Sequence, residues 1–286
     1  MDAPGHKSRS LLRLAATAVA AGAAAASYMA YEARWVECRQ RDLRVAGLPS
    51  PWSGLKLLHL SDVHAGSFSG NQRSLERVVH WAEPLAPDLV LLTGDVIGPH
   101  KDSQPCLDLL KRLRPTMGMF AVTGNHEYGL SKAPLARARD TGDIWREADV
   151  TLLSDSCAAL PSRDGTTLVL CGADYLSGGY GLLGPGAIPR LGDPQAFPIL
   201  LIHDPPPSDS PLTTSFTLAF AGHTHGGQLR VPGPSGLTAL HKEDYEHLSG
   251  VHAWGGGTIV ISRGVGVGFL PFRLLTRPEA TLWRLL

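Results

Sequence analysis

Short apolar runs and longer amphipathic stretches alternate through the first half of the chain after residue 54. The apolar runs predict strands at Leu55–Leu60, Leu89–Leu92 and Met117–Val122. Between them, apolar residues at helical spacing predict helices at Asn71–Trp81, Cys106–Leu113 and residues 133–149. Alternating strands and helices are typical of βαβ units and of a parallel sheet.

The second half of the chain has mostly short strands with little helix between them. The runs that predict these strands are Thr151–Leu153, Thr167–Leu170, Ile199–Ile202, Leu218–Phe220, Thr258–Ile261 and Ala280–Arg284. The Gly- and Pro-rich stretch Gly178–Pro194 is expected to form a surface loop. Both halves fit an α/β class, a four-layer α/β/β/α sandwich of two mixed sheets with outer helices.

The N-terminal region follows a different pattern, a basic tail at residues 1–13 and then an apolar run. Leu14–Tyr31 is eighteen residues long, carries no charge and contains ten alanines, a length that just spans a bilayer. Three interpretations stay open: a transmembrane anchor, a signal segment cleaved near Ala24–Ala26 with export of the protein, and a soluble Ala-rich helix. Both flanks are basic, so the positive-inside rule does not orient the run.

Residues 32–54 are expected to be a juxtamembrane segment and linker, and the globular domain is expected to cover residues 55–286. Tyr31–Arg44 alternates loosely and also suits an edge strand, whereas Gly47–Gly54 contains two prolines and suits a linker.

Composition narrows the function classes further. Net charge is zero, which gives no indication of nucleic-acid binding, and hydrophobic residues make up 43% of the chain, enough for a sizeable core. Residues 1–50 carry seven Lys/Arg against four Asp/Glu, and this basic surplus beside an apolar run fits a membrane surface. The four cysteines form no CxxC pair; we expect buried thiols, while a disulfide stays open.

Polar residues with ligand chemistry follow five of the predicted strands. They are Asp62, His64, Asp95, Asn125, His203, His223 and His225, with His126 beside them. Because the carboxyl ends of parallel strands meet at one edge of a sheet, we expect these side chains to converge in one crevice. Taken singly, the Asp and Asn side chains also suit helix N-caps or turns.

The residue types of this set point to a dinuclear metal site. Oxygen and imidazole ligands without thiolate suit Mn, Fe, Zn or Co better than Ca. Seven ligands exceed the needs of one four-coordinate ion and suit two divalent ions that share a carboxylate, which serves phosphate-ester hydrolysis by a metal-activated hydroxide. Gly94, Gly124 and Gly222 each precede ligands, where the backbone must turn sharply and let a phosphate come close.

The ordered blocks DxH, GD, GNHE, H and GHTH closely resemble the calcineurin-like metallophosphoesterase family, over Leu55 to Leu286. The run GHTHGGQ at Gly222–Gln228 and the later Ser262–Gly266 are similar to the bacterial membrane-associated branch, whose members typically carry an N-terminal hydrophobic segment. The resemblance implies a first ion bound by Asp62, His64 and His225, a second bound by Asn125, His203 and His223, and a bridging Asp95.

The same resemblance implies that His126 donates a proton to the leaving oxygen or stabilises charge, and that Glu127 orients it. Asn125, His126 and Arg263 are the expected substrate contacts, although Arg263 also suits a structural salt bridge.

A phosphodiester or pyrophosphate in a lipid-linked or nucleotide-sugar substrate is expected. UDP-2,3-diacylglucosamine of lipid A biosynthesis, at a bacterial inner membrane, is the specific example that the resemblance implies. Two alternatives stay open: a general phosphomonoesterase or phosphodiesterase acting on proteins or nucleotides, and a non-catalytic metal-binding scaffold.

Overall fold

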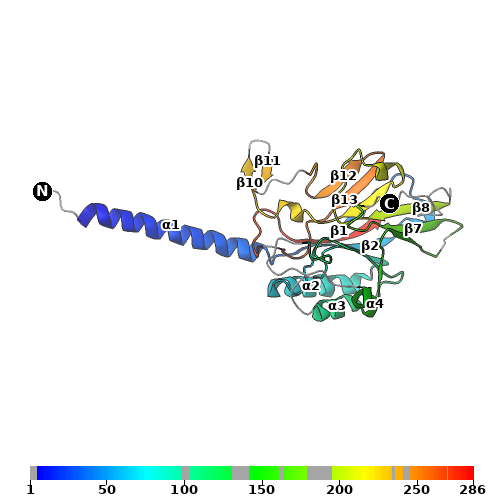
Figure 1. Cartoon of the computed structure of the whole chain (residues 1–286), viewed down its shortest axis with the longest axis horizontal. Helices are drawn as coiled ribbons and strands as arrows, with labels where there is room; N and C mark the ends of the chain where they lie inside the picture. Colours follow the sequence, from blue (N-terminus) through cyan, green and yellow to red (C-terminus); the bar gives the residue numbers. More distant parts are fainter. Residues whose placement is uncertain are drawn as a thin grey trace.

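The computed structural model describes residues 5–97, 103–130, 142–161, 164–178, 195–233, 236–240, 245–268 and 270–286. A long helix, α1 (Gly5–Glu32), leaves one end of a domain that contains the other elements (Figure 1).

The domain is built on two six-stranded mixed sheets. The first has the order β1 (Glu37–Leu43), β14 (Glu279–Leu285), β2 (Lys56–Leu60), β3 (Leu89–Thr93), β4 (Met119–Val122) and β5 (Val150–Leu152). The second has the order β12 (Gly250–Trp254), β13 (Gly257–Ile261), β9 (Leu218–Ala221), β8 (Ala196–Leu201), β7 (Thr167–Gly172) and β6 (Ser156–Ala159). Strands β2 to β5 are parallel to one another, as are β7, β8, β9 and β13. A separate antiparallel hairpin joins β10 (Arg230–Gly233) to β11 (Gly236–Ala239).

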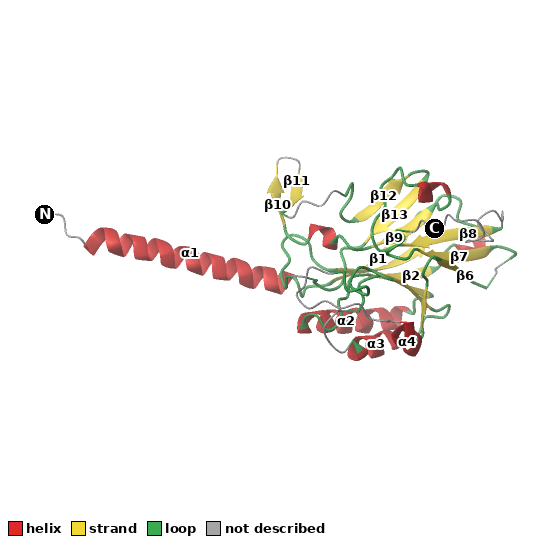
Figure 2. Cartoon of the chain, viewed as in Figure 1, coloured by secondary structure: helices red, strands yellow, loops and turns green. Residues whose placement is uncertain are grey.

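Apolar residues on both faces of the central strands explain the layers. In β3, Leu89 and Leu91 pack toward the second sheet, whereas Val90 and Leu92 pack toward helices. These helices, α2 (Ser69–Ala82), α3 (Gln104–Lys111) and α4 (Gly142–Glu147), cover the outer face of the first sheet (Figure 2). The two mixed sheets, the outer helices and the preceding apolar helix confirm the predicted α/β class; of the predicted four layers, the described residues form the two sheets and one outer layer of α-helices.

The outer face of the second sheet is covered by a smaller cluster. Leu212 and Phe216, in and after a 3₁₀ turn at Pro211–Thr214, pack there with Trp254. Among the described residues, the α-helices of the domain therefore lie against the first sheet.

Strand β1 extends the folded domain toward the N-terminus. It pairs in parallel with β14 from Glu37 to Leu43, so this segment is an edge strand. Leu43 and Trp52 are buried between the sheets, within the stretch that we expected to precede the domain. Four of the seven residues of β1 are charged and largely line the exposed sheet edge, which is why no apolar run marks the strand.

Four further strands, β6, β10, β11 and β12, were not predicted. They are edge or hairpin strands with many partly exposed positions, so no apolar run marks them either. The predicted helix at residues 133–149 is described only as α4. Residues 131–141 lie outside the described part of the chain, as do residues 179–194 of the predicted surface loop.

Two of the cysteines form a disulfide. Cys157 in β6 and Cys171 in β7 are register partners of an antiparallel pair and are bonded to each other. The expectation of buried thiols is therefore wrong for these two, because strand register and not sequence spacing places them together. Cys106 is a buried thiol, and partial burial raises the pKa of the Cys38 thiol to about 11.

A thiol assay in denaturant is expected to detect two reactive thiols before reduction and four after it. Because the disulfide joins residues 14 positions apart, Cys157→Ser/Cys171→Ser is expected to lower the free energy of unfolding by about 3 kcal/mol. Denaturant unfolding curves measure this loss. Four reactive thiols in unreduced protein made under oxidising conditions would contradict the bond.

Candidate metal centre

The predicted ligand segments of both sheets meet at one edge of the domain. Asp62 and His64 follow β2, Asp95 follows β3, Asn125 and His126 follow β4, His203 follows β8, and His223 and His225 follow β9. Three groups have potential ligand atoms within 4.8 Å of one another, namely Asp62–His64–His225, His64–Asp95–His126 and Asp95–His203–His223. The structure thus brings the candidate residues into one cluster.

The first group places two imidazoles against one carboxylate. The Nε2 atoms of His64 and His225 lie 3.0 Å apart, and Asp62 Oδ1 lies 3.9 and 3.5 Å from them respectively. The other oxygen, Asp62 Oδ2, accepts hydrogen bonds from Ser61 Oγ at 2.6 Å and from the backbone N–H of His223 at 3.0 Å. These bonds hold the carboxylate so that Oδ1 faces the histidines.

The second group has the same chemistry. Nε2 of His203 lies 3.0 Å from Nδ1 of His223 and 3.5 Å from Asp95 Oδ2. Nδ1 of His203 donates to the carbonyl oxygen of Thr93 at 2.7 Å. This bond fixes the ring and leaves Nε2 of the neutral imidazole free to bind a cation.

Asn125 follows β4, between two residues that approach Asp95. Its Nδ2 donates to the carbonyl oxygen of Leu130 at 3.0 Å, which fixes the amide. Both neighbours approach Asp95 Oδ1: the His126 N–H donates to it at 2.8 Å, and a Cβ on Gly124 would lie 2.3 Å from it.

Asp95 joins the two groups. Its Oδ2 lies 3.8 Å from Nε2 of His64 and 3.5 Å from Nε2 of His203. Nε2 of His126 lies 3.8 Å from the same oxygen. One carboxylate oxygen is therefore near ligand atoms of both groups.

Unpaired buried oxygens test whether these residues fit metal ions. Asp62 Oδ1 and Asn125 Oδ1 are buried and accept no hydrogen bond from the described residues. An unsatisfied buried acceptor is costly and uncommon, and a cation satisfies it. The cluster of carboxylate, amide and imidazole atoms thus suits two divalent ions, with Asp95 between them.

The backbone of the ligand segments is strained. Five of the ligand residues have φ between 49° and 68°, a region that residues other than glycine seldom occupy: Asp62, His64, Asp95, His223 and His225. Of the three glycines, Gly94 has a positive φ of 82°. Gly222 instead lets the backbone pack closely against Ser61, since a Cβ there would lie 1.8 Å from Ser61 Oγ.

Burial and neighbouring charges shift the pKa values of the ligands. Burial raises the pKa of Asp62 to about 6, although His203 opposes the shift. Burial disfavours a charged His203, but the carboxylates of Asp95 and Asp62 outweigh it and raise its pKa to about 10. A cation must displace this proton, so metal binding releases protons.

Glu127, which we expected to orient His126, directs its carboxylate at backbone groups. Its buried carboxylate accepts hydrogen bonds from the backbone N–H groups of Asp95, Val96, Ile97 and Gly124, at 2.8–3.0 Å. The carboxylate therefore holds the loops of Asp95 and Asn125 together, and these backbone contacts help to position His126. Burial, with the charge of Asp95, raises the pKa of Glu127 to about 7.

Arg263 makes the salt bridge that we kept as the alternative to substrate contact. Its guanidinium lies 2.6 Å from Glu279 Oε2 and 2.8 Å from Glu37 Oε2. These two carboxylates hold the side chain between β1 and β14.

Arg273 is a residue of the centre that sequence reasoning missed. Its guanidinium is fully buried, and Nη2 lies 3.0 Å from Nδ1 of His225. It donates to the carbonyl oxygens of His225, Arg263, Gly266 and Thr276. Arg273 therefore fixes the His225 ring at Nδ1, and it also holds the loop of Gly266 beside Asp62.

Arg273→Met is expected to lower the affinity for the ion beside His225 by about 10–100-fold, the range for loss of a residue that supports a ligand. The ion beside His203 is expected to stay bound, because Thr93 and not Arg273 supports that histidine. Equilibrium dialysis of the metal-loaded protein measures both sites, with Arg284→Met, an exposed arginine paired with Asp42, as the control. Unchanged binding of both ions would contradict the role of Arg273.

Tyr175 is a second residue that sequence reasoning missed. Its ring centroid lies 5.9 Å from that of His203 and 6.4 Å from that of His223. Tyr175 follows β7 by three residues, so the rule that found the ligands, a polar residue just after a strand, also applies to it.

Comparisons with known proteins identify the family of the chain. The family model for calcineurin-like phosphoesterases matches residues 55–227. The chain is 28% identical to YkuE of Bacillus subtilis, an uncharacterized metallophosphoesterase, with 95% of this chain and 93% of the relative covered. It is 30% identical to the phosphodiesterase YaeI of Escherichia coli, with 90% and 92% covered. A solved structure, TT1561 of Thermus thermophilus, is 12% identical and covers 74% of this chain and 91% of its own, with a TM-score of 0.46.

The chain belongs to the calcineurin-like phosphoesterase family. It is a metal-dependent phosphoesterase, a hydrolase.

Proposed function

We propose that the protein hydrolyses a phosphodiester or pyrophosphate with two divalent ions, Mn, Fe, Zn or Co, held by the seven candidate ligands. The observation that carries the proposal is the central position of Asp95, whose Oδ2 lies 3.5–3.8 Å from three histidine nitrogens. A carboxylate shared by two ligand groups suits a pair of ions. The similarity to a relative named as a phosphodiesterase supports a diester substrate.

The ions, when bound, neutralise phosphoryl charge and lower the pKa of a water molecule. The residues of the chain position and protonate the substrate. His126 has a side chain that is 13% exposed and an Nε2 that points toward Asp95, so it can reach a substrate held at the ligand cluster. We assign it the transfer of a proton to the leaving oxygen.

Helix α1 is proposed to be a membrane anchor. Arg9–Glu32 is long and apolar enough to cross a bilayer, and none of its most apolar window is buried against the domain. The disulfide favours a domain on the oxidising side of the membrane, since such bonds persist there. The basic tail at residues 1–13 then lies on the opposite side.

A lipid-bearing substrate is supported by exposed leucines around the centre. Leu130 and Leu176 are 56% and 63% exposed. The carbonyl oxygen of Leu130 accepts a hydrogen bond from Asn125, and Leu176 follows Tyr175, whose ring lies near His203. A cavity of about 550 Å³ adjoins the centre at Asp204 and Tyr245, where it can accept the group esterified to the phosphate.

The proposal is tested with purified full-length protein and Mn²⁺ on an aryl phosphodiester, an aryl phosphomonoester and UDP-2,3-diacylglucosamine. Hydrolysis of the diester or the pyrophosphate supports it. Activity on the monoester alone supports a general phosphatase. Metal binding without turnover of any ester supports a non-catalytic scaffold.

A further inference from the structure

Six exposed apolar side chains gather at the end of the domain from which α1 leaves. We call this surface the apolar rim: Tyr31, Trp35, Leu237, Leu240, Leu270 and Leu275, which are 38–60% exposed. They come from three segments: the end of α1, the β10–β11 hairpin and the segment after residue 269. Figure 1 shows the hairpin at the same end of the domain as the C-terminal end of α1.

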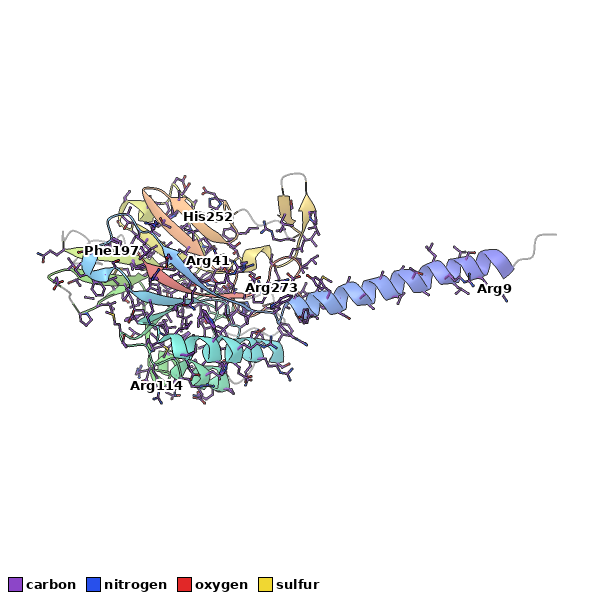
Figure 3. All side chains as sticks on the ribbon, turned by 180° about the vertical axis from the view of Figure 1, so that it is seen from behind. Arg9, Arg41, Arg114, Phe197, His252 and Arg273 are labelled. Atoms are coloured by element: carbon purple, nitrogen blue, oxygen red, sulfur yellow. A yellow bond between two sulfur atoms is a disulfide. The ribbon has the colours of Figure 1, made fainter. Side chains whose placement is uncertain are left out.

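Hydrogen bonds of backbone and side-chain groups join these three segments into one unit. The N–H of Arg230 donates to the carbonyl of Leu274, and Gln228 Nε2 donates to the carbonyl of Leu270. The N–H of Arg273 donates to the carbonyl of Met29, and that of Thr276 donates to the buried Glu32 carboxylate. The rim therefore keeps a fixed position relative to the last turn of α1, and Figure 3 shows Arg273 at this junction.

The position and charge of the rim favour a lipid surface as its occupant. Tyr31 and Trp35 stand where α1 meets the domain, and aromatic residues are enriched at that depth of a bilayer. Arg34 is exposed and Arg277 lies 3.5 Å above the Trp35 ring, whereas the neighbouring Glu32 is buried. Arg277 is partly exposed and paired with Glu37, so Arg34 is the exposed cation here, and an exposed arginine among apolar side chains suits anionic headgroups.

The rim adjoins the metal centre. Arg273, which contacts His225, is in the segment that carries Leu270 and Leu275. Gly268, two residues before Leu270, lies so close to His64 that a Cβ on it would be 3.3 Å from Nε2. A substrate bound at the centre therefore lies close to the surface that the rim would touch.

We propose that the apolar rim rests on the headgroup layer of the membrane, so that the centre acts on a phosphoester of a lipid that stays in the bilayer. This inference rests on the proposed function and names its substrate class. The rim would act beside α1 as a second, shallow contact that sets the height of the centre above the membrane.

A fluorescence experiment tests the contact in the full chain. An environment-sensitive fluorophore is attached to Leu240→Cys, or to Val251→Cys in β12 as an exposed control outside the rim, in a Cys38→Ser background. The proteins are reconstituted into phosphatidylcholine/phosphatidylglycerol vesicles with or without spin-labelled lipid. We expect a blue shift and quenching by spin-labelled lipid at position 240 and neither at position 251.

Each other outcome overturns part of the account. Protein absent from the vesicles overturns the anchor and the rim contact together. Vesicle-bound protein with an unquenched label at position 240 overturns the rim contact alone. A blue shift at position 240 without vesicles shows that protein covers the rim, from a second copy or another partner, and also overturns it.

An activity experiment separates the rim from the chemistry. Leu237→Ser/Leu240→Ser is expected to lower turnover of a phosphodiester lipid in vesicles roughly tenfold, as loss of apolar contact with lipid predicts. Turnover of the soluble aryl phosphodiester is expected to be unchanged. If the variant and the wild type turn over the lipid in vesicles at equal rates, the inference is overturned. If the wild-type protein hydrolyses neither the lipid nor the aryl phosphodiester, the proposed function is overturned.

Discussion

Asp95→Asn is expected to release both metal ions and to abolish turnover. The carboxylate lies near ligand atoms of both halves of the centre, and Asn keeps its size while removing its charge. Loss of a supporting residue alone costs 10–100-fold in metal affinity, so a shared ligand is expected to cost at least about 100-fold.

Metal content by mass spectrometry and turnover of the aryl phosphodiester measure this loss. Asp108→Asn, which changes an exposed carboxylate on α3 that is 59% accessible, is the matched control. Thermal unfolding of the metal-free proteins separates loss of binding from loss of fold. Two ions retained in Asp95→Asn would show that Asp95 is not shared.

His126→Ala is expected to keep both ions while turnover falls by about 10²–10⁴-fold, the range for a general acid or base. Its side chain is beside the ligand cluster, in one of the three possible metal groups, but we expect the seven proposed ligands to hold two ions without it. The pH–rate profile should also lose the limb that the proton donor creates.

The exposed His80 in the last turn of α2 provides a control, and His80→Ala is expected to behave like the wild type. Loss of an ion in His126→Ala would make His126 a metal ligand. Unchanged turnover would remove it from the chemistry.

The candidate ligands could be predicted because each follows an apolar run. Strand ends such as Leu60, Thr93 and Val122 lie at one edge of the first sheet, so local sequence already determines where Asp62, Asp95 and Asn125 meet. The second sheet contributes His203 and His223 by the same rule. The pattern therefore predicted the fold class and the composition of the centre.

Other features depend on contacts between distant segments and left no local signal. Arg273 is buried only because three loops close around it, and nothing in its neighbourhood distinguishes it from a surface arginine. Glu127 binds backbone groups of a loop 30 residues away, which spacing does not show. Strand β1 and the Cys157–Cys171 bond depend on strand register, which the sequence pattern left open.

Anomalous scattering from a crystal grown with Mn²⁺ is the most direct test of the central claim, a dinuclear centre. The account predicts two peaks, one in contact with Asp62, His64 and His225 and one with Asn125, His203 and His223, with Asp95 in contact with both. A single peak, or two peaks of which neither contacts Asp95, would contradict it.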